Sequence, residues 1–65
     1  MKEAKNRYTI EVLKYGGPSI HLELEADTYK VHDGVIEFRL DGGIEWITIA
    51  IYPVDKTIIS KIVKL

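Results

Sequence analysis

A histidine and two glutamates at alternating positions are the first residues that could do chemistry: His21, Glu23 and Glu25. If this stretch is a β-strand, the three side chains point to the same side, because side chains alternate along a strand. Imidazole and carboxylate groups are common metal ligands. A single strand brings them into poor convergence, however, and His32 has no evident reason to join them. The stretch therefore predicts a solvated polar face and no metal site.

No other set of residues has the spacing of a catalytic site. The two serines, Ser19 and Ser60, lie outside any nucleophile-elbow pattern. The glycine-rich stretch 15–19 lacks the lysine and the following helix of a phosphate-binding loop, and so predicts a turn. The chain has no cysteine, which excludes disulfides and thiolate metal ligands. We therefore predict that the protein is not an enzyme and needs no cofactor.

The composition is that of an ordinary folded domain. The chain has 65 residues, of which 46% are hydrophobic and 29% charged. No apolar run approaches the roughly 18 residues of a membrane-spanning helix, and the polar N-terminus lacks the apolar segment of a secretory signal. We expect a cytoplasmic protein with no membrane partner, built of a flexible arm over residues 1–7 and a single β domain over residues 8–65.

Alternation of apolar and polar residues predicts that the domain is all-β. It occurs over residues 8–12, over 19–26 with a continuation to 32 after a kink, and over 36–40, and the apolar stretch 44–52 adds a further strand. Asp33-Gly34 is the strongest hairpin signal, and Asp41-Gly42-Gly43 predicts the next turn. We expect an antiparallel meander of five or six strands, which forms a curled sheet or a small, partly open barrel.

The C-terminal residues 54–65 fit two structures. Their apolar positions match either one face of a short helix or a strand with one lysine on the wrong side. Because β-branched residues are dense here, we predict a strand and keep the short helix as the alternative.

The stretch from Ile44 to Tyr52 is apolar on both of its predicted faces. Simple alternation puts four residues on one side (Trp46, Thr48, Ala50 and Tyr52) and three on the other (Ile47, Ile49 and Ile51). A domain of this size buries only about 60% of the surface of its unfolded chain, so it has little material to cover both sides. We therefore predict a homodimer or higher oligomer whose interface consists of Trp46, Ile47, Ile49 and Ile51. The alternatives are a face held for a different protein and an ordinary monomer core.

Charge is distributed unevenly along the chain. Residues 21–45 contain seven acidic side chains (Glu23, Glu25, Asp27, Asp33, Glu37, Asp41 and Glu45), whereas both ends of the chain are basic. We predict that Glu23, Glu25 and Glu37 form an acidic face that binds a basic site on a partner protein. The alternative is a small-ligand, nucleotide or nucleic-acid-binding barrel that uses the aromatic side chains and the terminal lysines. The acidic middle makes nucleic acid the less favoured partner.

The last two-thirds of the chain resembles a loose class of small phage, prophage and bacterial proteins. The matching layout is an acidic-Ala-Asp step, an aromatic residue, a "V-x-DG-x-x-x-F" hairpin, a proline and a final strand. It is carried by Glu25, Ala26, Asp27, Tyr29, Val31, Asp33, Gly34, Phe38, Pro53 and either Ile59 or Ile62. The resemblance implies a small all-β fold without catalytic residues. It also implies a non-enzymatic function: binding and inhibiting a host protein, or binding a small signalling nucleotide.

Overall fold

The computed structural model describes residues 3–65 and confirms the all-β prediction, because these residues form six strands and one short 3-10 helix. The elements are β1 (Asn6–Val12), β2 (Ile20–Ala26), β3 (Thr28–His32), β4 (Val35–Asp41), β5 (Trp46–Pro53), η1 (Val54–Lys56) and β6 (Thr57–Lys64). The C-terminal segment is thus a strand, as predicted. Within residues 3–65, no helix has the length and apolar character needed to cross a membrane.

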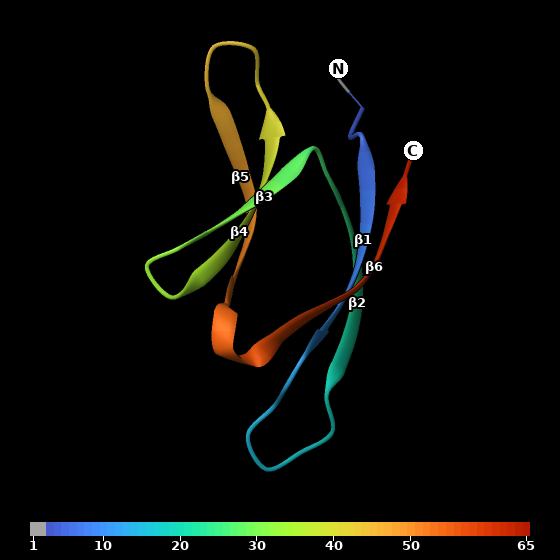
Figure 1. Ribbon diagram of the computed structural model, residues 1–65, viewed down its shortest axis with the longest axis vertical. Coiled ribbons are helices and arrows are strands. Elements are labelled where there is room, and N and C mark those ends of the chain that lie inside the picture. Colours follow the sequence, from blue (N-terminus) through green and yellow to red (C-terminus); the bar gives the residue numbers. More distant parts are fainter. Residues whose placement is uncertain (1–2) are drawn as a thin grey trace.

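The six strands make two antiparallel sheets of three strands each (Figure 1). The first sheet has the order β2-β1-β6, and the second has the order β3-β4-β5. The chain follows a meander from β3 to β5, then crosses back through η1 so that β6 pairs with β1. The two sheets remain separate, which corresponds to the open form of the predicted curled sheet or barrel.

The core lies between the two sheets. Its buried residues are Tyr8, Ile10, Ala26, Ile36 and Phe38. They come from β1, β2 and β4, so both central strands contribute. The rings of Tyr8 and Phe38, one from each sheet, have centroids 5.2 Å apart, a separation typical of favourable aromatic pairs. We call the side of each sheet that faces this core its inner face, and the opposite side its outer face.

The hairpin between β3 and β4 confirms the turn predicted at Asp33-Gly34. His32 pairs directly with Val35, so the loop has two residues. Both have positive φ, 49° for Asp33 and 76° for Gly34. Positive φ at both central positions matches the right-handed twist of the flanking strands, and aspartate followed by glycine tolerates it best. This turn fixes the register between β3 and β4.

Asp27 joins the two sheets at the step between β2 and β3. It is only 8% exposed. Its Oδ1 atom accepts a hydrogen bond of 2.9 Å from the Lys5 backbone N–H, and its Oδ2 atom accepts one of 2.7 Å from the Asp41 N–H. Its own N–H donates to the Arg39 carbonyl at 2.9 Å. The kink predicted after residue 26 is therefore a corner at which one chain segment leaves the first sheet and enters the second.

The N-terminal boundary differs from the predicted flexible arm over residues 1–7. β1 begins at Asn6, and the Lys5 carbonyl accepts a 2.7 Å hydrogen bond from the Leu65 N–H. Residues 5–7 are therefore tied to Asp27 and to the C-terminus. Residues 1–2 lie outside the described residues.

Replacing Asp27 with alanine should destabilise the fold by about 2 kcal/mol, because two backbone N–H groups lose a charged acceptor in a buried place. Urea unfolding followed by circular dichroism measures this loss. Asp55→Ala, at an exposed position in η1, is the matched control and should change stability by less than about 0.5 kcal/mol. Equal stability of the two variants would contradict the role of Asp27 as the corner.

Candidate interaction surface

β5 is an edge strand of the second sheet, and no strand within residues 3–65 pairs with its other side. It reads Trp-Ile-Thr-Ile-Ala-Ile-Tyr-Pro and contains no charged residue. An edge strand leaves a row of backbone N–H and C=O groups without partners, and a long apolar edge is a template for pairing with another chain. β5 is therefore the strongest candidate for an interaction surface.

The four residues predicted as an oligomer interface are all exposed in the single chain. The exposed fractions are 51% for Trp46, 51% for Ile47, 39% for Ile49 and 56% for Ile51. We call these four side chains the β5 surface. Large apolar side chains grouped at this exposure are typical of surfaces that bind another molecule.

The predicted division of β5 into two alternating faces is wrong, because β5 contains a bulge. Phe38 pairs with Ala50 and Arg39 pairs with Thr48, so Ile49 is an extra residue between these pairs. The bulge reverses the alternation on its N-terminal side.

The bulge therefore distributes the β5 surface over both faces of the sheet. Trp46 and Ile51 lie opposite Asp41 and Glu37 on the outer face. Ile47 lies opposite Leu40 on the inner face. The β5 surface is thus a rim around the free edge of the sheet, rather than one flat isoleucine face.

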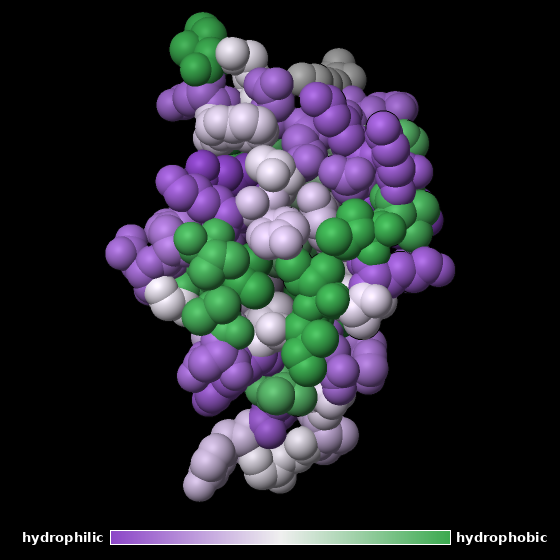
Figure 2. Space-filling model, in the orientation of Figure 1, coloured by the Kyte–Doolittle hydropathy of each residue, from purple (hydrophilic) through white to green (hydrophobic). Residues whose placement is uncertain are grey.

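Hydrophobic side chains continue from β5 onto η1 and β6. Val54, Ile58 and Ile62 are 37%, 48% and 53% exposed. Figure 2 shows a band of hydrophobic surface across the middle of the molecule, over the region where Figure 1 places the end of β5, η1 and β6. The sequence prediction gave residues 54–65 as a strand but did not include Val54, Ile58 and Ile62 in the interface.

A polar network lies on the outer face of the second sheet, next to the β5 surface. Its centre is Glu37, which is 8% exposed although it points away from the core. Glu37 Oε1 is 2.5 Å from His32 Nε2 and accepts a 3.0 Å hydrogen bond from Arg39 Nη2, while Glu37 Oε2 accepts a hydrogen bond from the Thr48 hydroxyl. Three strands supply this network, and the register set by the Asp33-Gly34 turn brings His32 diagonally next to Glu37.

The network perturbs the pKa values of its two titratable members in opposite directions. Hydrogen bonds from Arg39, Thr48 and His32, in that order of effect, lower the pKa of Glu37 from 4.5 to about 2. Hydrogen bonds to Asp33 and then to Glu37 raise the pKa of His32 above 6.5. Glu37 is therefore ionised and already bonded within its own chain.

The structure does not bring the three predicted acidic residues together. Glu23 and Glu25 lie on β2 in the first sheet, whereas Glu37 lies on β4 in the second. Glu25 forms an ion pair with Arg7 at 2.9 Å. Glu23 lies opposite Thr9 on the outer face of the first sheet. The three residues therefore do not form a single acidic face. Glu37 is bonded within its own network, and Glu25 is paired with Arg7.

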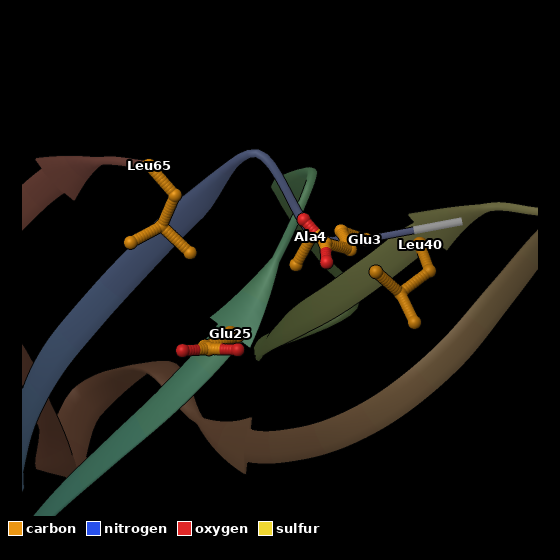
Figure 3. Close-up of a pocket in the computed structure, with 5 residues that line it drawn as sticks. All are labelled: Glu3, Ala4, Glu25, Leu40 and Leu65. Carbon is orange, nitrogen blue, oxygen red and sulfur yellow. The ribbon is translucent and has the colours of Figure 1, made fainter. Parts of the chain in front are cut away.

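A shallow pocket opens where the chain termini meet the two sheets (Figure 3). It is lined by Glu3, Ala4, Glu25, Leu40 and Leu65. The two leucines lie on opposite sides of the acidic residues (Figure 3). Within residues 3–65, no group of three or more His, Asp or Glu side chains is arranged to hold a metal ion.

Comparison with protein-family models, with curated proteins and with solved structures found no match. The interpretation of the site therefore depends on its own geometry.

We expect Glu37→Gln to lower the pKa of His32 towards 6.5, because the substitution removes a neighbouring negative charge. Asp33→Asn should act in the same direction. NMR titration of the His32 ring measures both shifts. Glu23→Gln, on the other sheet, is the control and should leave the His32 pKa unchanged.

The lowered pKa of Glu37 also predicts how the stability of the wild type, compared with Glu37→Gln, depends on pH. Because the folded pKa of Glu37 lies below its unfolded value, its contribution is present above about pH 4.5 and is lost as the pH falls through about 2. The stability difference between the wild type and Glu37→Gln should therefore shrink on acidification from pH 5 to pH 2, as measured by urea unfolding. A constant difference would contradict the network.

Proposed function

We propose that this protein is a non-enzymatic interaction module that self-associates and binds a partner protein through the β5 surface. The observation that carries the proposal is the free, uncharged edge of β5, with its four large apolar side chains 39–56% exposed. A chain of 65 residues gains stability when such a surface is covered, since small domains bury little apolar area on their own.

The proposal extends to the biological role. The resemblance to small phage and prophage proteins supports a cytoplasmic module that inhibits a host protein by occupying its surface. The separation of Glu37 from Glu23 and Glu25 favours an apolar contact at β5 over imitation of nucleic acid.

A second candidate function is binding of nucleic acid at the end of the first sheet. The specific observation in its favour is that β1 and β6 pair, so that the neighbouring strands at this end carry Lys5, Arg7, Lys61 and Lys64. Figure 1 shows both termini at the same end of this sheet. Clustered positive charge is what phosphate binding needs. Opposing it, Glu25 neutralises Arg7.

The aromatic side chains also oppose this second candidate. Tyr8, on the same sheet as the basic cluster, is only 3% exposed, and the half-exposed Trp46 belongs to the other sheet. Stacking on aromatic rings is a major source of affinity for single strands. The basic end therefore lacks the platform that such binding uses.

The first proposal is tested by placing a photoreactive amino acid at Ile51 and, as a control, at Tyr15. Tyr15 is 99% exposed in the loop between β1 and β2, far from β5 in sequence and on the other sheet's hairpin. After irradiation of cells that produce the protein, we expect covalent adducts from position 51 and none from position 15. Gel electrophoresis and mass spectrometry identify them. Absence of adducts at 51, or equal adducts at both positions, would contradict the proposal.

The second candidate is tested by retention on single-stranded DNA at low salt. If it holds, the double variant Lys61→Glu, Lys64→Glu should lose retention, because both phosphate-binding charges are reversed. Lys30→Glu, on the second sheet, is the matched control and should behave as the wild type. No retention of the wild type at low salt removes this candidate.

A further inference from the structure

We propose that β5 pairs antiparallel with β5 of a second copy, so that two β3-β4-β5 sheets join into one six-stranded sheet across a twofold axis. This inference rests on the proposed function and deepens it, since it names the partner and the geometry of contact. It is carried by a comparison of the edge strands of the two sheets.

The two sheets have four edge strands, β2 and β6 in the first and β3 and β5 in the second. Proteins protect such edges with charged side chains, which disfavour pairing with another chain. β2 carries Glu23 and Glu25, and β3 carries Lys30. β6 carries Lys61 and Lys64. β5 is the edge, among the strands of residues 3–65, that has no charged residue.

Charge also decides which edge can pair with its own copy. In a twofold antiparallel pair, each strand meets itself reversed, so the residue at its centre lies opposite the same residue of the copy. For β2 that residue is Glu23 and for β3 it is Lys30, so like charges would face each other. In β6, Lys61 lies beside the centre and would approach its own copy. β5 meets no such repulsion.

The shape of β5 limits the size of the contact. Pro53 has no N–H to donate, and the bulge at Ile49 interrupts the regular spacing of the strand. The ladder between the two copies is therefore short and centred within residues 47–51. Short interfaces of this kind are weak, and we expect dissociation at concentrations of about 1–100 μM.

The absence of cysteine allows a direct test by single cysteine substitution. A disulfide needs Cα atoms about 4.4–6.8 Å apart, a distance that only residues near the twofold axis meet. Among single cysteine substitutions at residues 47–51, we expect the one nearest the twofold axis to form a disulfide-linked dimer of twice 7.4 kDa at micromolar concentration, far ahead of the others. Ile58→Cys and Ile62→Cys in β6, where exposure is similar, are the controls.

Sedimentation equilibrium of the wild type provides the second measurement. We expect a monomer–dimer equilibrium that Ile51→Lys weakens at least tenfold, since burial of the lysine is costly and both oxygens of the opposite Glu37 are already bonded by His32, Arg39 and Thr48. Val63→Lys, on the outer face of the first sheet, should leave it unchanged. Circular dichroism checks that each variant folds.

The outcomes separate this inference from the proposed function. A wild type that stays monomeric, or disulfide dimers that form fastest at the β6 positions, overturns β5–β5 pairing. A monomeric wild type would also remove self-association from the proposed function. Binding of a partner protein through β5 survives either result if photoreactive position 51 still joins a different protein. Disulfide formation confined to one β5 position, together with sensitivity to Ile51→Lys, supports the inference.

Discussion

The fold depends on one buried carboxylate at a corner of the chain. Asp27 bonds the backbone of Lys5 at the start of the first sheet and that of Asp41 at the end of β4, while its own N–H bonds the Arg39 carbonyl. These bonds allow a single segment to supply an edge strand to each sheet, β2 before the corner and β3 after it. They also set Tyr8 of the first sheet against Phe38 of the second, so the core forms between the two central strands.

The corner has a consequence for the opposite side of the molecule. Because β2 and β3 are continuous through Asp27, the two sheets are joined there, whereas β5 and β6 are connected only by the short η1 segment. The sheets do not pair with each other at β5 and β6, so both strands keep a free edge. Lysines protect β6, whereas β5 has no charged residue and only Pro53 and the bulge at Ile49 limit its pairing. The two sheets are thus joined at the corner and separate at β5 and β6, and this separation leaves the β5 surface exposed.

The sequence predicted the elements better than the contacts between them. Strict alternation in residues 20–26 and the Asp33-Gly34 turn are local signals, so the strands and the hairpin followed from them. The bulge at Ile49 depends on how β5 aligns with β4, and no residue near Ile49 announces it. The burial of Glu37 depends on side chains from three strands, and only the hairpin register could have paired it with His32. Exposure of Trp46, Ile47, Ile49 and Ile51 could be anticipated, because residues 44–52 are apolar on both sides and a chain of 65 residues has little material to cover both.

The network around Glu37 determines which partner suits the β5 surface. Glu37 lies directly opposite Ile51, so a partner that covers Ile51 also removes water from the Glu37 carboxylate. An ionised carboxylate without partners would make that burial costly. Arg39, Thr48 and His32 already bond both of its oxygens, and they hold its pKa at about 2. The surface therefore requires no cation from a partner. An uncharged apolar strand is sufficient to cover it, and β5 of a second copy is such a strand.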